Sequence, residues 1–184
     1  IYDDNPHVKE MMLTGGSPSM HATLVDKLTK FAKERNIFVT METEGSHATK
    51  PEVPINLVSL SPKFSNSVPV VGVETPMGKI VDQKFVDVHN RSRLNLDVMR
   101  ELIDYNDDYH FKPVWDGTQE NINEIEEFRV KMDIPKDKTY IMPAGDTRET
   151  LVEMYPKVFE LCAQTGYRMT GRDHIIAFDT EREV

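Results

Sequence analysis

Two glycines and two glutamates are the residues of this 184-residue chain whose types and spacing could bind a small charged ligand. Gly15 and Gly16 follow a short apolar stretch, and a glycine pair lets the backbone approach a ligand and offer its N–H groups. Glu42 and Glu44 end a second apolar stretch, where a carboxylate could bind an ammonium group or a pair of hydroxyls. A plain strand-to-helix turn and a solvated turn are the alternative interpretations of these two pairs.

Other polar residues follow or flank the later apolar stretches. Ser61, Pro62 and Lys63 place a hydroxyl and an ammonium on a stiff turn. Lys112 lies in an apolar segment, where its charge is costly to bury without a carboxylate partner, so structural pairing is the alternative there. His174, taken alone, is more often a hydrogen-bonded core histidine than a catalytic group. Ligands of parallel α/β sheets gather at the carboxyl ends of strands, so these turns are the candidate site.

Predicted strands and helices alternate along the chain and position these turns. The pattern predicts helices at residues 19–35, 96–106, 118–132 and 147–165, the first capped by Ser19 and the last ended by Gly166. Strand–helix–strand order is typical of right-handed parallel βαβ units, so we predict an α/β fold with a mainly parallel sheet. Strands are predicted at residues 8–14, 37–42, 55–60, 109–115, 138–143 and 174–178.

Residues 64–95 interrupt this alternation with valine-rich pieces between Ser, Asn, Pro and Gly. We expect a loop insertion there, with a small hairpin over residues 70–81. It is not a linker, because the alternation resumes after it, so residues 1–184 are expected to form one domain. The insertion could serve as a lid or as the interface of a homodimer.

The composition excludes several classes of protein. No apolar run approaches the roughly 18 residues that a membrane-spanning helix needs. The net charge of -9 argues against a duplex nucleic-acid surface, which needs clustered Lys and Arg. A single cysteine, Cys162, can form no intrachain disulfide or thiolate metal cluster. Because no signal peptide is visible, we expect a cytoplasmic location.

Several motifs occur in an order that is more specific than any one of them. Thr-Gly-Gly-Ser-Pro at 14–18, Glu-Thr-Glu-Gly-Ser at 42–46 and Ser-Pro-Lys at 61–63 are followed by Phe-Lys-Pro-Val at 111–114 and Met-Pro at 142–143. Arg-Asp-His-Ile at 172–175 and the ending Arg-Glu-Val complete the series. Outside residues 63–94, this order resembles the 7-carboxy-7-deazaguanine synthases, a family of radical S-adenosylmethionine enzymes. Ser-Pro-Lys with a late histidine and this chain end distinguishes that family within its superfamily.

The resemblance implies an incomplete (β/α) barrel, as in radical S-adenosylmethionine enzymes. It implies that S-adenosylmethionine contacts Gly15, Gly16, Glu42, Ser61, Pro62 and Lys63. It also implies that the pterin substrate contacts Thr14, His174 and the terminal carboxylate of Val184.

The implied activity is that of a carbon–nitrogen lyase, which converts 6-carboxy-5,6,7,8-tetrahydropterin to 7-carboxy-7-deazaguanine in queuosine and deazapurine biosynthesis. The implied cofactors are S-adenosylmethionine, a [4Fe–4S] cluster and Mg²⁺, with a flavodoxin or ferredoxin as electron donor. The family's cluster motif, Cys-x-x-x-Cys-x-x-Cys, precedes the Gly-Gly turn and has no match here. We therefore expect the N-terminal portion to be absent, no metal site in this chain, and no activity of the chain alone.

Two other interpretations are open. One is a different radical S-adenosylmethionine protein, such as an activating enzyme for a glycyl radical, although Ser-Pro-Lys and His174 count against it. The other is a cluster-free descendant that binds a pterin or nucleotide, or docks on a partner. Ser17, where the family usually has an acid or amide, and Glu183, where glycine is common, depart from the family pattern.

Overall fold

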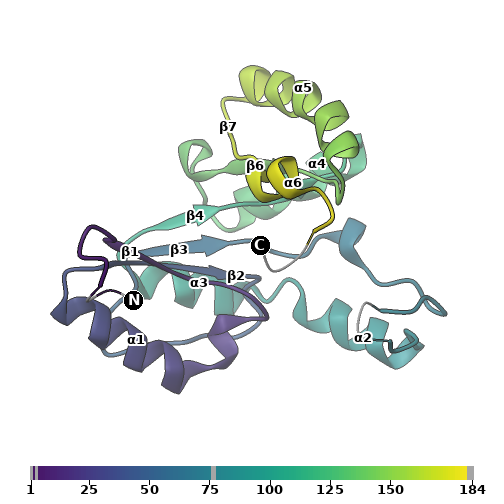
Figure 1. Ribbon diagram of the computed structural model, residues 1–184. Helices are drawn as coiled ribbons and strands as arrows, with labels where there is room; N and C mark the ends of the chain where they lie inside the picture. The colour runs from purple at the N-terminus through teal and green to yellow at the C-terminus, as the bar shows by residue number, and fades with distance from the viewer. Residues whose placement is uncertain (1, 3, 76–77, 182–184) are drawn as a thin grey trace. The chain divides into compact units, whose positions relative to one another are not determined.

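The computed structural model describes residue 2, residues 4–75 and residues 78–181. The chain forms two compact units, and both are discontinuous in sequence (Figure 1). The first unit consists of Ile1–Pro62 and Arg91–His110, and the second of Lys63–Asn90 and Phe111–Val184. The prediction of one domain with an insertion at residues 64–95 stays a prediction.

The first unit is built on a sheet with the strand order β1-β2-β3-β4. Its strands are β1 (Glu10–Leu13), β2 (Phe38–Thr43), β3 (Leu57–Leu60) and β4 (Tyr109–Phe111). β1 pairs with β2 and β2 with β3, both in parallel, with Leu13 opposite Met41 and Thr43 opposite Leu60. The predicted parallel βαβ arrangement is therefore confirmed, and the carboxyl ends of β1, β2 and β3 are neighbours.

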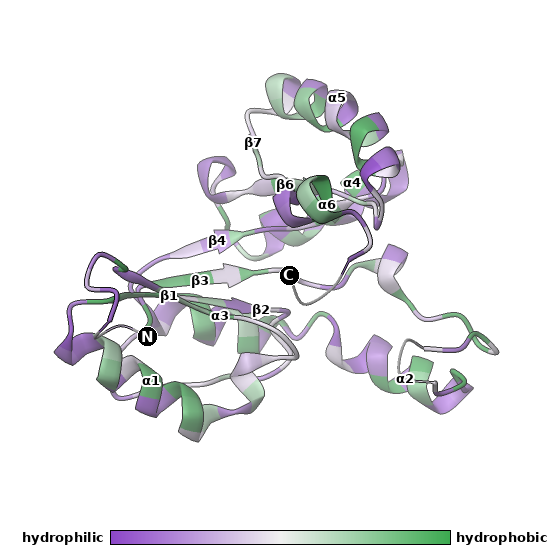
Figure 2. Cartoon of the chain, viewed as in Figure 1, coloured by the Kyte–Doolittle hydropathy of each residue, from purple (hydrophilic) through white to green (hydrophobic). Residues whose placement is uncertain are grey.

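Two helices belong to this unit. α1 (Ala22–Glu34) packs against β2 and buries Val25, Thr29 and Ala32. Figure 2 shows hydrophobic and hydrophilic residues alternating along its ribbon. α3 (Leu96–Tyr105) packs against β3, and the side chain of Asn95 caps its first turn. The predicted cap of α1 by Ser19 is wrong, because a short 3-10 turn (Pro18–Met20) precedes this helix and buries Ser19.

Gly45, in the turn after β2, has the closest neighbours among the glycines of the first unit. Its φ is +80°, a conformation that L side chains rarely adopt. A Cβ there would lie 2.6 Å from Cγ of Met99 and 2.8 Å from Cδ1 of Leu60. Both of those side chains are completely buried. The turn that carries Glu44 is thus fixed against α3 and β3 by a residue without a side chain.

The second unit has a parallel sheet in the order β5-β6-β7. Thr118 and Thr147 cap α4 and α5, and Gly166 ends α5 with a φ of 79°, as predicted. Rings of Phe64, Phe111 and Phe128 pack together in its core. The elements are β5 (Val114–Trp115), α4 (Gln119–Lys131), β6 (Tyr140–Pro143), α5 (Arg148–Thr165), β7 (Arg168–Met169) and α6 (Asp173–Phe178).

The predicted strand at residues 174–178 is wrong, because these residues form α6 and β7 is the last strand. Arg148 explains the helix: its guanidinium donates to the carbonyl oxygens of Ile176 at 2.8 Å and Ala177 at 2.9 Å. Carbonyls at the end of a helix need such partners. The predicted strand at 109–115 is two strands, β4 and β5, because Pro113 between them has no N–H to donate to a sheet.

Residues 68–92 contain the segment for which a hairpin is predicted, 70–81, and a helix that the sequence pattern does not predict. An antiparallel bridge joins Glu74 to Ile80, in the segment where a hairpin is expected. α2 (Gln83–Ser92) follows it. Phe85 and Val88 are exposed on α2, and Val86 is its buried apolar residue. The apolar residues therefore do not follow one buried stripe, which is why the helix carries no clear periodic signal.

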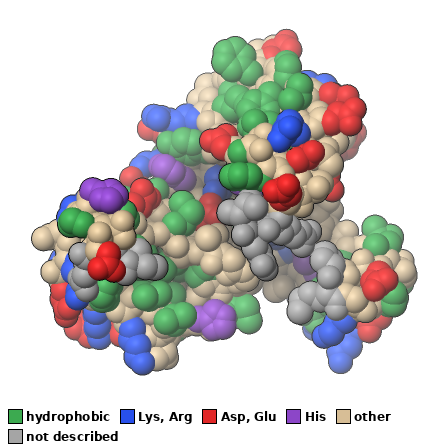
Figure 3. Space-filling view, viewed as in Figure 1, with side chains coloured by type: hydrophobic (Ala, Val, Ile, Leu, Met, Phe, Trp, Pro, Cys, Tyr) green, Lys and Arg blue, Asp and Glu red, His purple; other side chains and the backbone are tan. Residues whose placement is uncertain are grey.

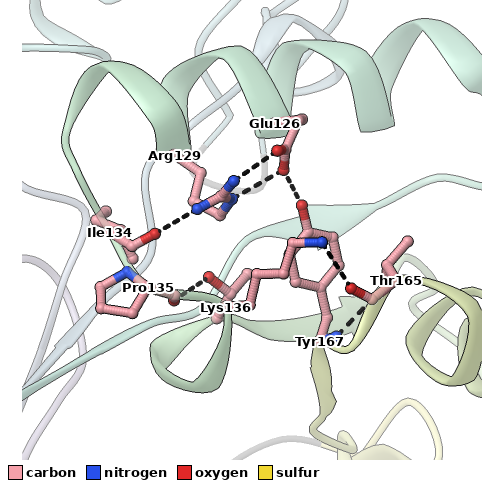
Figure 4. A network of polar contacts seen from close by, with 8 residues as sticks. Glu126, Arg129, Ile134, Pro135, Lys136, Thr165 and Tyr167 are labelled. Atoms are coloured by element: carbon pink, nitrogen blue, oxygen red, sulfur yellow. Dashed lines mark hydrogen bonds and ion pairs between the residues drawn. The ribbon is translucent and has the colours of Figure 1, made fainter.

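A polar network fixes the end of α4 in the second unit (Figure 4). Arg129 donates from Nε and Nη2 to the Glu126 carboxylate, at 2.8 and 2.6 Å, and from Nη1 to the carbonyl oxygen of Ile134. The hydroxyl of Tyr167 also donates to Glu126. The hydrogen bonds from Arg129 hold the pKa of Glu126 below its usual value, against the opposing effect of burial. This carboxylate is a structural group.

Candidate functional site

The candidate site begins where β1 and β2 end. Thr14 directly follows β1, and its hydroxyl donates to Oε2 of Glu42 in β2 at 2.9 Å. The parallel pairing of the two strands causes this contact, because it places their carboxyl ends side by side. The structure thus brings together two residues that lie 28 positions apart and were each predicted as ligand contacts.

The Gly-Gly turn after Thr14 is open. Gly15 and Gly16 have φ values of +81° and +59°, and a Cβ on either would meet no atom within 4 Å. Their backbone N–H groups donate no hydrogen bond within the ranges that the structure describes. Successive free amides in such a turn form an anion-binding concavity. The turn therefore offers donors to a ligand with an anionic group.

A chain of hydroxyls connects this turn to the end of β2. Ser17 donates to Oε1 of Glu44 at 2.8 Å. The hydroxyls of Ser17 and Ser19 lie 3.1 Å apart, as do those of Ser19 and Thr43. Oγ1 of Thr43 also accepts the backbone N–H of Gly45 at 3.1 Å. The position of Glu44 relative to the Gly-Gly turn is therefore set by side-chain contacts as well as by the sheet.

Glu44 is a half-buried carboxylate with several donors. Ser46 donates to the same Oε1 that accepts Ser17, and the Ser46 hydroxyl lies 2.8 Å from Nδ1 of His47. Burial alone raises the pKa of Glu44, but hydrogen bonds from Ser46, from its own backbone and from Ser17 outweigh it and lower the pKa below the usual value. The group consequently stays ionised at neutral pH, as a binder of a cation must.

The third strand end lies beside the second. The backbone N–H of Ser61, directly after β3, donates to the carbonyl oxygen of Thr43 at 2.8 Å. Ser61 is half-buried and Pro62 is buried. Lys63 and His174 are exposed residues of the second unit, His174 on α6 and not in a strand. Val184 lies outside the described residues.

The sequence alone does not predict the contacts of Ser17 with Glu44 or of Ser19 with Thr43, which join residues 27 and 24 positions apart. The sequence does contain one indication of them, because hydroxyl residues directly follow the first strand and a polar run ends the second. Given a parallel pair of strands, those residues must be neighbours. The register of the pair is not encoded locally, so the individual contacts could not be derived.

The donor set fits some of the implied cofactors and not others. Free amides, two carboxylates and several hydroxyls match the amino acid end and the ribose of S-adenosylmethionine. A [4Fe–4S] cluster is not matched, because Cys162 is buried on α5 and no three His, Cys, Asp or Glu side chains gather among the described residues. The described part of the chain offers no ligand set for Mg²⁺ by the same criterion.

Two further observations concern the surface. A shallow apolar hollow of about 660 Å³ lies on α5 and α6, where green side chains gather in Figure 3. Its lining of Val152, Tyr155, Pro156, Phe159, Met169, Asp173 and Ile176 provides few polar partners for a charged cofactor. Across the described ranges, no helix combines the length and apolar character needed to pass through a membrane.

The chain is similar in sequence to known enzymes over most of its length. No family model matches the chain. It is 30% identical over 175 residues to a 7-carboxy-7-deazaguanine synthase of Rhodopirellula baltica, covering 95% of this chain and 63% of that protein. It is also 30% identical to a 7-carboxy-7-deazaguanine synthase of Halobacterium salinarum, covering 96% of this chain and 68% of the relative. The chain thus spans about two thirds of the length of these curated relatives.

Solved structures show the fold. QueE from Escherichia coli aligns with a TM-score of 0.53 at 17% identity, covering 89% of this chain and 57% of QueE. A domain of the pyruvate-formate lyase-activating enzyme from Bacteroides vulgatus aligns with a TM-score of 0.52 at 15% identity, covering 88% of this chain and 97% of the domain. Both have the radical S-adenosylmethionine fold. The predicted α/β class with parallel strands, as in those enzymes, is confirmed.

Proposed function

This chain belongs to the 7-carboxy-7-deazaguanine synthase family, and on that premise we propose that its first unit binds S-adenosylmethionine at the ends of β1, β2 and β3. The reaction served is the conversion of 6-carboxy-5,6,7,8-tetrahydropterin to 7-carboxy-7-deazaguanine, a lyase reaction. The observation that carries the proposal is the open Gly15–Gly16 turn, with two free amides between the Thr14–Glu42 and Ser17–Glu44 contacts.

Each role follows from the chemistry of the side chain. The amides of Gly15 and Gly16 donate to the anionic end of the cofactor. The carboxylate of Glu42 accepts hydrogen bonds from ribose hydroxyls, and the hydroxyl of Ser61 donates to them. The buried ring of Pro62 stiffens the turn that carries Ser61. These groups are set by a parallel sheet, so the cofactor is oriented without reorganisation of the backbone.

Three further residues are proposed as ligand contacts. Lys63 serves as a further cofactor contact, and Thr14 and His174 as contacts to the pterin. When bound in a radical enzyme, S-adenosylmethionine supplies the group that removes a hydrogen atom from the substrate. The described residues hold no ligand set for the iron–sulfur cluster, so no step at a cluster is assigned to them.

Binding of S-adenosylmethionine to Gly15→Ala tests the proposal. Gly166 provides the matched control, because its φ of +79° is close to the +81° of Gly15 and a Cβ at either glycine meets nothing within 4 Å. A methyl group on Gly15 occupies the space above the turn where the cofactor is placed. Overpacking a close contact costs about 1–3 kcal/mol, or roughly five- to 150-fold in affinity.

Isothermal titration calorimetry should therefore show weaker binding to Gly15→Ala and wild-type binding to Gly166→Ala. Failure of the unaltered chain to bind S-adenosylmethionine would reject the proposed function. Equal binding by wild type and Gly15→Ala would reject the placement of the cofactor at this turn.

A further inference from the structure

A polar pocket of about 340 Å³ lies in the first unit, at the edge of the sheet where β2 and β3 begin. Its lining includes Lys33 from the last turn of α1, Phe38, the first residue of β2, and Asn56, directly before β3. Phe38 and Thr43 begin and end β2, so at roughly 3.3 Å per residue they lie about 16 Å apart along the strand. The pocket is therefore separate from the proposed cofactor site, which lies where the strands end.

Asp107, between α3 and β4, gives this pocket a carboxylate whose position is fixed. Nδ2 of Asn56 donates to Oδ2 of Asp107 at 3.0 Å, while Oδ1 of Asn56 accepts the backbone N–H of Val39 at 2.9 Å. The backbone N–H of Asp107 donates to the carbonyl oxygen of Ile55 at 3.0 Å. Among the described residues, nothing donates to Oδ1 of Asp107. Because a carboxylate has about four lone-pair positions, this one can still accept two parallel N–H groups.

Lys33 and Phe38 supply two other kinds of contact. Lys33 is exposed, and its ammonium forms no ion pair within the part of the chain that the structure describes. Phe38 is 45% exposed, although the other residues of β2 are buried or half-buried. An aromatic ring with an open surface in a pocket can stack on a flat ring of a ligand. The pocket thus combines a cation, an open aromatic ring and an oriented carboxylate.

We infer that this pocket is a second ligand site, which binds a flat heterocycle that carries a carboxylate and a pair of neighbouring N–H donors. The ligand carboxylate pairs with Lys33, the ring stacks on Phe38, and the N–H pair donates to Asp107. A 2-amino-4-oxo pyrimidine ring presents such a pair, because its ring N–H and its amino group are adjacent.

The choice among such heterocycles rests on the proposed function. Its product, 7-carboxy-7-deazaguanine, has the carboxylate and the N–H pair and is flat throughout. The tetrahydropterin substrate has saturated carbons in its second ring, which therefore puckers and stacks less well. Product bound in this pocket occupies the first unit without displacing the cofactor.

Three ligands isolate the polar contacts in isothermal titration calorimetry. 7-Deazaguanine lacks the carboxylate of the product, and 7-carboxy-7-deazahypoxanthine lacks its amino group. Lys33→Met should bind the product about three- to fivefold more weakly than wild type, the range of an ion pair partly screened by water, and should bind 7-deazaguanine equally well. Asp107→Asn should bind the product about tenfold more weakly, with a smaller loss for 7-carboxy-7-deazahypoxanthine. Phe38→Ala should weaken the binding of all three.

Two matched controls come from the same unit. Lys27 lies on α1 and Asp104 on α3, and both are exposed and outside the lining of the pocket. Lys27→Met and Asp104→Asn make the same chemical changes as the two pocket variants. They should keep the wild-type dissociation constants for all three ligands. Circular dichroism of each variant checks that the fold is retained.

The outcomes separate this inference from the proposed function. No binding of 7-carboxy-7-deazaguanine by wild type, or binding that Lys33→Met and Asp107→Asn leave unchanged, would overturn the inference. Tighter binding of L-tryptophan, which presents a ring, a carboxylate and an ammonium, would overturn the assigned class of ligand.

The affinity for S-adenosylmethionine, measured on the same proteins, tests the separation of the two sites. It should stay within twofold of wild type in Lys33→Met and Asp107→Asn, and a tenfold loss there would place the pocket in the cofactor site and overturn the inference. A wild-type chain that binds the product through Lys33 and Asp107 but does not bind S-adenosylmethionine would reject the proposed function and support the pocket.

Discussion

Gly45→Ala tests how closely the turn after β2 is packed against the core of the first unit. Gly45 combines a φ of +80° with a space in which a Cβ would approach Cγ of Met99 to 2.6 Å and Cδ1 of Leu60 to 2.8 Å. The tip of Leu60 can move, whereas Cγ of Met99 lies near the root of a side chain that is completely buried. The added methyl group must therefore displace core atoms.

Two costs contribute to the magnitude. The left-handed conformation costs an alanine about 1–2 kcal/mol relative to glycine. Insertion of a methyl group into a filled core costs typically about 1–3 kcal/mol more. The variant should therefore lose about 2–5 kcal/mol of the free energy of unfolding, a large part of the roughly 5–15 kcal/mol of a typical domain.

Gly15→Ala is the control that separates the two costs, because Gly15 lies in the same unit with a φ of +81° and open space around its Cβ position. Urea unfolding followed by circular dichroism should show a loss of about 1–2 kcal/mol for Gly15→Ala, from backbone strain alone. The difference between the two variants gives the packing cost. Equal losses, to within about 0.5 kcal/mol, would mean that Met99 moves at no cost and would refute the packing argument.

Two further predictions concern the second unit. Burial raises the pKa of the Cys162 thiol to about 11, so at pH 8 its thiolate is about a hundredfold rarer than that of a thiol with the ordinary value of 9.0. Reaction with Ellman's reagent at pH 8 should be slow in the folded protein and fast in urea, and fast reaction without urea would contradict this. Tyr167→Phe removes a hydrogen bond to Glu126, which stays paired with Arg129, so urea unfolding should show a loss of about 0.5–1.5 kcal/mol. An unchanged midpoint would show that this contact is not formed in solution.

The elements that could be predicted from the sequence are those with strong local signals. α4 and α5 have a threonine cap at the start and an apolar stripe, and Gly166 adds a stop signal to α5. β2 and β3 are short apolar runs bounded by turn residues. Each of these signals lies within a few residues of the element, so tertiary context is not needed to detect it.

The elements that were missed depend on contacts far along the chain. His-Ile-Ile-Ala-Phe has the composition of a strand, but Arg148, 28 and 29 residues away from its partners, satisfies the carbonyls of a helix. Ser19 has the residue type of a helix cap, but its hydroxyl lies beside Thr43 on a neighbouring strand. Such competition between local and distant partners cannot be decided from local propensity.

Some features of the candidate site could likewise be predicted from the sequence, and others could not. The residue types at the strand ends indicated the place, because parallel strands bring their carboxyl ends to one edge. The contact of Thr14 with Glu42 follows from that rule. The orientation of Glu44 does not, because it depends on which hydroxyls reach it, and therefore on the register of β1 and β2 and on the turn fixed by Gly45.

The discontinuity of the two units has a consequence for synthesis. β1, β2 and β3 are complete once residue 60 has been made, but α3, which covers β3 with Met99 and Leu102, ends only at Tyr105. At roughly 5–20 residues per second, a ribosome needs about 2–9 seconds to add the intervening chain. During that time the apolar face of β3 lacks its helix and a nascent segment of the other unit is already emerging. The first unit to begin folding is thus not able to finish before part of the second has been made, and nascent chains should be most prone to aggregation in this interval.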